Sequence, residues 1–238
     1  MKVLWSSLVE SSVWLGDLGM RILSAADIHG VWRVYEWLAE LAQRDTDVLI
    51  LAGDLLESNF VAEQRKQARR IVSLLRELPV PVLYLMGNDD NVSLEYEDHK
   101  VLSVHGRRIE LGGFGFVGYQ YSPPFVGDVF VKPESEIEAD LKEIEPLLNP
   151  QTILVTHTPA FGKADLTFGK EHAGSPSIAA LVERRPVLAH VHGHIHESFG
   201  RDGNHFNVAS AGVCRAMSID LPSLECQALD LRVMARRE

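Results

Sequence analysis

Apolar runs and amphipathic segments alternate along the first third of the chain, and this alternation most restricts the fold. The runs at residues 21–26 (RILSAA), 47–52 (DVLILA) and 82–86 (VLYLM) have the length of buried strands. Between them, residues 31–44 and 62–78 carry apolar side chains at helical spacing. Strand, helix, strand, helix, strand with short links predicts an α/β fold with parallel strands joined by right-handed crossovers.

The rest of the chain has shorter elements. Its pattern predicts short strands within residues 101–118, a Pro- and Gly-rich loop at 119–131, a helix at 134–148, a strand at 152–157, a helix at 176–185, a strand at 188–191 and closing strands at 205–209, 215–220 and 225–233. We expect residues 20–238 to form one domain, because this length suffices for one well-buried core. Residues 1–19 fit a secretory signal poorly and are expected to be an extension of unknown role.

Composition narrows the class of protein. Apolar residues make up 46% of the chain and charged residues 24%, which is typical of a globular protein. The formal net charge of -10 disfavours a broad phosphate-binding face, so nucleic acid is not expected as a partner. No apolar run reaches the roughly 20 residues of a membrane-spanning helix, so no membrane partner is expected. Cys214 and Cys226 are the only cysteines, which favours a reducing, cytoplasmic location without disulfides.

Polar residues follow five of the predicted strands at the point where each strand ends. They are Asp27 and His29, Asp54, Asn88 and Asp89, His157, and His194 and His196. In open α/β sheets the turns at the carboxyl ends of the strands form the ligand crevice, so these side chains are expected to meet. The D-x-H and H-x-H spacing would put both members of each pair on one side of an extended backbone. Each residue alone could be a turn former or a helix cap, but five such turns at one edge favour a site.

These residue types favour metal binding. Imidazole and carboxylate ligands with one amide suit borderline ions such as manganese, iron or zinc. Without Asp89, seven ligands of this kind remain; they exceed a single tetrahedral zinc site, and they are enough for two divalent ions that share a carboxylate. An H-x-H pair on its own would be weak evidence, so the prediction depends on the whole set.

The order of these turns resembles that of the calcineurin-like metallophosphoesterases. The blocks are D-x-H at residues 27–29, G-D ending at Asp54, G-N ending at Asn88, His157 before Thr-Pro, and G-H-x-H ending at His196. The segments THTPAFG, HAGSPS and HGHIHES are similar to those of a small bacterial subgroup of predicted phosphoesterases. The resemblance implies a four-layer α-β-β-α sandwich, in which two mixed sheets pack face to face with helices outside.

The resemblance also implies a dinuclear centre. The first ion would be held by Asp27, His29 and His196, the second by Asn88, His157 and His194, with Asp54 as the bridge. Two cations about 3.5 Å apart can deprotonate a bridging water and hold both oxygens of an in-line displacement at phosphorus. The prediction is therefore a metal-dependent phosphoesterase, with a small phosphodiester expected before a phosphomonoester. The alternative is a catalytically weak module that binds metal or protein on the same fold.

One position departs from the family pattern. The family usually has His after the Gly-Asn of the third block, where it stabilises the transition state or protonates the leaving oxygen, and this chain has Asp89. A carboxylate beside two divalent ions stays ionised and is a poor general acid. We take Asp89 and Asn88 as the catalytic candidates, and we expect Asp89 to orient His29 or a water and the enzyme to prefer good leaving groups. Asp90 is expected to be a local cap or a ligand-orienting residue.

Eight further residues are secondary candidates: His190, His192, His172, Ser175, His99, His105, Tyr119 and Tyr121. The first two continue the every-second-residue spacing of His194 and His196 and are either a second layer of the site or buried strand residues. The next two begin a helix, where backbone N–H groups receive an anion or a capping side chain. The last four are candidates for the lining of the pocket.

Overall fold

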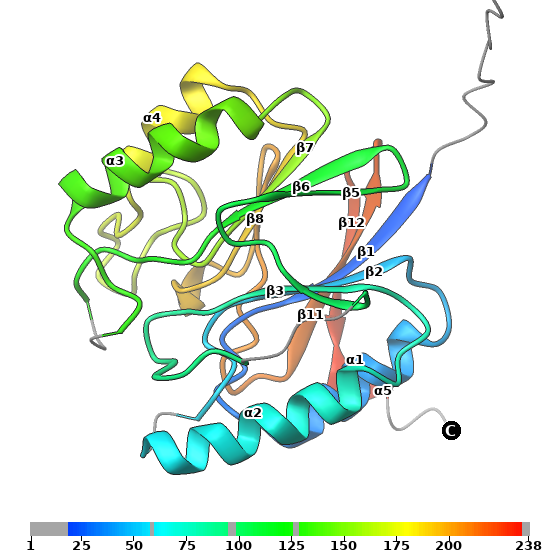
Figure 1. Cartoon of the computed structure of the whole chain (residues 1–238). Helices are drawn as coiled ribbons and strands as arrows, with labels where there is room; N and C mark the ends of the chain where they lie inside the picture. Colours follow the sequence, from blue (N-terminus) through cyan, green and yellow to red (C-terminus); the bar gives the residue numbers. More distant parts are fainter. Residues whose placement is uncertain (1–18, 58–59, 95–98, 126–128, 235–238) are drawn as a thin grey trace, which may run out of the picture.

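Two mixed sheets form the centre of the molecule (Figure 1). The computed structural model describes residues 19–57, 60–94, 99–125 and 129–234, and in these ranges each sheet has six strands. The first sheet runs β12 (Glu225–Asp230), β11 (Arg215–Leu221), β1 (Met20–Ala25), β2 (Val48–Ala52), β3 (Val82–Leu85) and β4 (Val101–Ser103). The second runs β5 (Arg108–Leu111), β6 (Phe114–Tyr119), β7 (Thr152–Thr156), β8 (Ala189–His192), β10 (His205–Asn207) and β9 (Gly200–Asp202). Strands β1, β2 and β3 are parallel, as predicted.

Helices cover the outer face of each sheet (Figure 1). The first sheet is covered by α1 (Trp32–Ala42), α2 (Val61–Leu75) and the short α5 (Leu231–Met234), and the second by α3 (Glu134–Ile144) and α4 (Pro176–Arg184). Two 3₁₀ turns, η1 (Glu145–Leu147) and η2 (His196–Ser198), complete the described elements. The predicted α-β-β-α sandwich is confirmed.

The core lies in three layers because the strands are buried on both faces. In β2, Ile50 belongs to the cluster between the two sheets, together with Phe116 and Ile153 of the second sheet, whereas Leu49 and Leu51 belong to the cluster under the helices. This is why the strand reads as an unbroken apolar run rather than an alternating one. The carboxyl ends of the parallel strands in both sheets are thereby fixed relative to one another.

Two predicted elements end differently. The strand predicted at residues 225–233 ends at Asp230 and continues as α5, because Leu231 is buried against the first helix layer and its N–H donates to the Cys214 carbonyl at 2.9 Å. The α-helix predicted at 134–148 ends at Ile144, since Pro146 has no backbone N–H to continue the α-helical hydrogen bonds, and the chain goes on as the 3₁₀ turn η1.

One strand was not predicted, and part of the predicted N-terminal extension lies outside the described residues. Strand β9 was not predicted, because residues 200–202 carry no apolar alternation. Residues 1–18 of the predicted extension lie outside the described residues, and the domain boundaries stay a prediction. In the part of the chain that the structure describes, no helix combines the length and the apolar character needed to cross a membrane.

Replacing Phe116 with Ala is expected to destabilise the fold strongly, because its ring is fully buried between the two sheets. Deleting a buried Phe side chain costs about 3–5 kcal/mol of unfolding free energy. Urea unfolding followed by far-UV circular dichroism measures the change. Phe60→Ala is the control, since Phe60 is 81% exposed, and it should stay within about 0.5 kcal/mol of the wild type. Equal effects of the two changes would contradict the assigned core.

Candidate metal centre

The strand-end turns meet at the seam between the two sheets. Within the first sheet, the backbone N–H of Asp27 donates to the Gly53 carbonyl at 2.9 Å. Within the second, the N–H of Gly193 donates to the His157 carbonyl at 3.0 Å. Neighbouring turns in each sheet are thus joined by main-chain hydrogen bonds, and side chains then join one sheet to the other.

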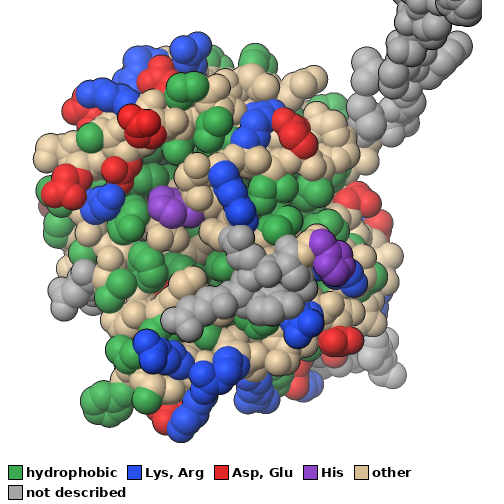
Figure 2. Space-filling model, in the orientation of Figure 1, with side chains coloured by type: hydrophobic (Ala, Val, Ile, Leu, Met, Phe, Trp, Pro, Cys, Tyr) green, Lys and Arg blue, Asp and Glu red, His purple; other side chains and the backbone are tan. Residues whose placement is uncertain are grey.

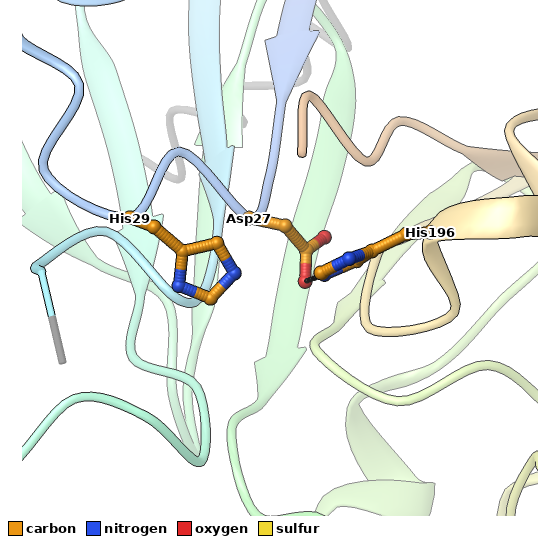
Figure 3. Close-up of side chains that lie close together, drawn as sticks. All are labelled: Asp27, His29 and His196. Atoms are coloured by element: carbon orange, nitrogen blue, oxygen red, sulfur yellow. Dashed lines mark hydrogen bonds and ion pairs between the residues drawn. The ribbon is translucent and has the colours of Figure 1, made fainter. Parts of the chain in front are cut away.

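Asp27 makes the first connection across the seam. Its carboxylate is fully buried, and it accepts the backbone N–H of His194 at 2.9 Å. One oxygen lies 3.2 Å from Nε2 of His196, and Figure 3 shows His29 and His196 on either side of this carboxylate. The ring centroids of the two histidines are 5.4 Å apart. Asp27, His29 and His196, which were predicted as one ligand set, are therefore adjacent in space.

His157 makes the second connection. Its Nδ1 lies 3.0 Å from the carbonyl oxygen of Ala52, which can only accept, so Nδ1 carries the hydrogen. The other nitrogen, Nε2, faces Oδ1 of Asn88 at 3.0 Å and Oδ2 of Asp54 at 3.3 Å. The main chain of the first sheet thus orients an imidazole of the second sheet toward an amide and a carboxylate of the first.

The buried carboxylates of the site raise the pKa values of neighbouring imidazoles, as expected of a site that binds a cation. Burial opposes the charged form of His157, but the Asp54 carboxylate outweighs it and raises the His157 pKa to about 10. Burial likewise opposes ionisation of Asp54, yet His157 holds the Asp54 pKa well below its ordinary value. A hydrogen bond to Asp27 raises the pKa of His196. The carboxylates thus draw positive charge onto two neighbouring imidazoles, at the place where a metal ion would supply it.

The donor set fits divalent ions. Among the described residues, three groups of side chains place ligand atoms within 4.8 Å of one another: Asp27, His29 and His196; Asp27, Asp54 and His157; and His29, Asp54 and Asp89. Asp27, His29 and Asp54 each belong to two groups, so the three groups overlap and form one continuous cluster. Burial lowers the pKa of His194 to about 4, so this imidazole is neutral, as a metal ligand must be. His194 is outside the three groups but lies against His157, with 5.1 Å between ring centroids.

The backbone of these turns is not extended, so the period-two argument for the pairs is wrong. Asp27, His29 and His194 have φ values of 52°, 47° and 68°, in the left-handed region, and Asp54 has 51°. Such values are uncommon outside glycine and are most frequent for Asn, Asp and His. Left-handed residues reverse the chain sharply after β1, β2 and β8, and the side chains of these three turns meet through the reversals.

Two glycines of the motifs are required by close approach. A Cβ on Gly87 would lie 2.2 Å from Oδ1 of Asp54, and one on Gly193 would lie 2.2 Å from Oδ2 of Asp27. Each glycine therefore makes room for a buried carboxylate of a neighbouring turn. This gives the G-N and G-H blocks a physical reason that the sequence alone does not state.

Asp90 holds the second and third turns together. Its buried carboxylate accepts the N–H groups of Gly87 at 2.9 Å, Leu55 at 3.0 Å and Leu56 at 2.8 Å. Burial, and then the like charge of Asp54, raise the Asp90 pKa to about 8, against these three donors. Asp90 is thus a positioning residue for the turn that carries Asp54, in line with the orienting role expected for it.

Asp89 lies at the mouth of the cluster. Its carboxylate is 3.7 Å from Nδ1 of His29, longer than a hydrogen bond, and it accepts Nδ2–H of Asn88 at 3.3 Å. Its backbone N–H donates to Asp54 at 2.8 Å. Gln64 of α2, which was not predicted, donates to the Asp89 carbonyl at 3.0 Å. No pattern in the sequence distinguishes Gln64 from a surface residue of the helix.

The secondary candidates lie elsewhere. His190 and His192 are fully buried strand residues; His190 contacts Thr156 and His205. Ser175 caps α4, since its hydroxyl accepts the Ile178 N–H at 3.2 Å, so the capping alternative is the one observed. The remaining five do not line the pocket at the cluster: His172, His99, His105, Tyr119 and Tyr121.

The pocket over the cluster has a volume of about 310 Å³. Besides the predicted residues it is lined by Phe125, Thr167, Phe168, Gly169, Ile195 and Glu197. Sequence reasoning missed these residues because they lie in loops without periodicity. The available signal in the sequence is a Phe directly beside Pro or Gly in a predicted loop, as at Phe125 and Phe168.

Comparison with known proteins agrees with this geometry. Residues 20–198 match the sequence model of the family described as calcineurin-like phosphoesterase. The chain belongs to the calcineurin-like phosphoesterase family. Membership supports hydrolysis of phosphoester bonds and the binding of divalent metal by the Asp and His cluster.

Individual relatives are distant. The UPF0046 protein K07C11.7 of Caenorhabditis elegans is 23% identical over an alignment of length 202. The alignment covers 76% of this chain and 65% of the relative, so less than two thirds of that protein is covered. TT1561 of Thermus thermophilus has a TM-score of 0.70 at 17% identity, over 90% of this chain and 99% of that one. GAP50, described as the anchor in the inner membrane complex of Plasmodium, has a TM-score of 0.55 at 11% identity. That comparison covers 88% of this chain and 83% of GAP50. At these identities the structural likeness shows the fold alone.

Gly193→Ala is expected to disrupt metal binding, because the added methyl group would displace the Asp27 carboxylate. Elemental analysis of the purified variant after incubation with manganese should show at least one ion fewer per chain than the wild type. Gly19→Ala is the matched control, since a Cβ at Gly19 meets nothing within 4 Å. An unchanged metal content in Gly193→Ala would remove Asp27 from the ligand set.

Proposed function

We propose that this chain hydrolyses a small phosphodiester or phosphomonoester with two divalent ions held at the seam between the sheets. The observation that carries the proposal is the convergence of two buried carboxylates, Asp27 and Asp54, with imidazoles from both sheets. Asp54 and the histidines His29, His194 and His196 line the floor of one pocket. Buried carboxylates in such a setting need cationic partners, and the described lining of this pocket contains no Lys or Arg. Family membership supports a phosphoester as the substrate.

The ligand sets remain those expected from the sequence: Asp27, His29 and His196 for one ion, Asn88, His157 and His194 for the other, and Asp54 shared. When bound, two divalent ions lower the pKa of water and neutralise the charge of a phosphate group. Manganese, iron or zinc suits this mixture of imidazole, carboxylate and amide.

The chain's own residues pre-orient this set. The Ala52 carbonyl fixes the tautomer of His157, which leaves Nε2 free to bind a metal. Asp27 binds the His194 backbone N–H and so fixes the turn that carries both histidines of the H-x-H pair. Asp89 accepts the amide N–H of Asn88, which leaves Oδ1 of Asn88 facing the cluster. Little reorganisation is then required when ions and substrate bind.

The experiment combines elemental analysis with hydrolysis assays. We expect two metal ions per chain, and cleavage of bis-nitrophenyl phosphate, nitrophenyl phosphate or a cyclic nucleotide when manganese is added. Asp54→Asn and His157→Ala should each lower kcat/KM by more than about 100-fold, because even residues that only orient a metal ligand contribute about 10–100-fold. Asp45→Asn, which alters an exposed carboxylate, should leave both readouts unchanged.

A chain that holds no metal and cleaves none of these esters would contradict the proposal and favour the binding module on the same fold. Two bound ions without any hydrolysis would also contradict it, because they would separate metal binding from catalysis. Cleavage of the diester but not the monoester would select phosphodiesterase activity.

Asp89→His tests the departure from the family pattern. A histidine there could donate a proton to a poor leaving group, whereas the carboxylate cannot. We expect kcat/KM for an alkyl diester, relative to bis-nitrophenyl phosphate, to rise at least about tenfold in the variant, within the range of general acid catalysis. Asp89→Asn, which adds no acid, is the matched control. An unchanged alkyl-to-aryl ratio in Asp89→His would contradict the assigned role.

A further inference from the structure

Two phenylalanines stand exposed at the rim of the pocket. Phe168 is 90% exposed and Phe125 is 67% exposed, and both line the cavity whose floor is the ligand cluster. They come from different loops, one between β7 and α4 and the other after β6. The ring of Phe125 stands edge-on to His194, with 5.3 Å between centroids and a 75° interplanar angle. The apolar rim is thus continuous with the metal-binding floor.

The loop that carries Phe168 is firmly held. Asp165 is fully buried, and its carboxylate accepts the N–H groups of Gly162 at 3.0 Å and Gly174 at 2.9 Å and contacts Nδ1 of His172 at 2.5 Å. The Leu166 carbonyl accepts the hydroxyl of Ser198, which belongs to η2, at 2.8 Å. This loop is therefore fastened at its base and attached to the turn that supplies His196.

The tip of the same loop is a closed turn. The Lys170 N–H donates to the Thr167 carbonyl at 2.8 Å, and the Thr167 N–H donates to the Glu171 carbonyl at 3.0 Å. Phe168 and Gly169 lie within this turn. The fold thus holds a large apolar ring in solvent at the mouth of the pocket, where it gains nothing from the protein's own core.

The charges in the pocket restrict what this rim can bind. The described lining residues include the acidic Asp54, Asp89 and Glu197, and none is Lys or Arg. Basic side chains gather instead over α2, at the lower edge of Figure 2, where Arg65 and Arg69 line a separate groove. A second phosphate would therefore find no cation in this pocket. A volume of about 310 Å³ is at the lower end of the about 300–1,000 Å³ of small-molecule sites.

We infer that the pocket takes a phosphate ester whose other part is one flat, uncharged aromatic ring, stacked against Phe125 and Phe168. The phosphate lies over the ligand cluster and the ring against the rim. A simple aryl group and a nucleobase share this chemistry. The inference rests on the proposed function and specifies the substrate class of the same site.

Binding of phosphonates tests this without turnover. Isothermal titration of the manganese-loaded protein with phenylphosphonate and methylphosphonate gives the ratio of their dissociation constants. We expect phenylphosphonate to bind about two- to tenfold more tightly, the contribution of one aromatic contact. Phe168→Ala and Phe125→Ala should each lower this ratio. Phe168→Tyr should retain the ratio of the two dissociation constants, and Phe168→Leu should lower it. Phe60→Ala is the matched control: it removes an exposed ring away from the pocket lining and should leave the ratio unchanged.

The outcomes separate the two proposals. Equal binding of the two phosphonates by a wild type that hydrolyses esters overturns the aromatic site alone, as does a ratio that survives in Phe125→Ala and Phe168→Ala. A protein that neither binds a phosphonate nor cleaves an ester overturns the proposed function as well. Comparison of the KM values for adenosine 5′-phosphate and ribose 5-phosphate then distinguishes a nucleobase from a simple aryl group. A lower KM for the adenosine ester assigns a nucleobase. Equal KM values, together with tighter binding of phenylphosphonate than of methylphosphonate, assign a simple aryl group.

Discussion

The burial of two carboxylates between the sheets is the constraint on which the rest of the site depends. Asp27 and Asp54 lose nearly all contact with water, and an unpaired buried charge is costly. The chain meets this cost with N–H donors and imidazoles taken from the opposite sheet or from a neighbouring turn. The carboxylates consequently tie the two sheets together at one edge, and the site and the packing of the sandwich cannot be changed independently.

The fold positions these groups through strand ends rather than through helices. Parallel strands in both sheets end at the same edge, and left-handed residues turn the chain immediately after β1, β2 and β8. Glycines stand where a neighbouring carboxylate leaves no space for a Cβ, as at Gly87 and Gly193. Such a backbone is strained, and it persists because main-chain hydrogen bonds between the turns hold it.

Much of this could be predicted from the sequence, for a physical reason. Strands buried on both faces give unbroken apolar runs, and ligand-type residues directly after such runs must lie at one edge of a parallel sheet. The residues that hold the ligands were less predictable. Asp90 was expected only as a local cap or an orienting residue, and Gln64 was missed, because both act through contacts with segments that are distant in sequence. The local geometry of the pairs was wrong, since alternation along a strand does not continue into a turn with positive φ. Phe168 was not recognised, because nothing local shows that its loop is fastened by Asp165.

The polar floor and the apolar rim have different structural origins, and this bears on how such a pocket can vary. The floor is fixed by the sheets, so a change there disturbs buried charge and the contact between the two layers. The rim consists of loop residues, and the loop of Phe168 is held by hydrogen bonds within the loop itself, from Gly162 and Gly174 to Asp165. Phe168 can therefore be exchanged without loss of buried hydrogen bonds. Asp89 lies between these two regimes: its backbone N–H belongs to the floor through Asp54, whereas its side chain is partly exposed at the mouth. The side chain at this position can thus change the acid–base chemistry of the pocket while the main chain keeps Asp54 in place.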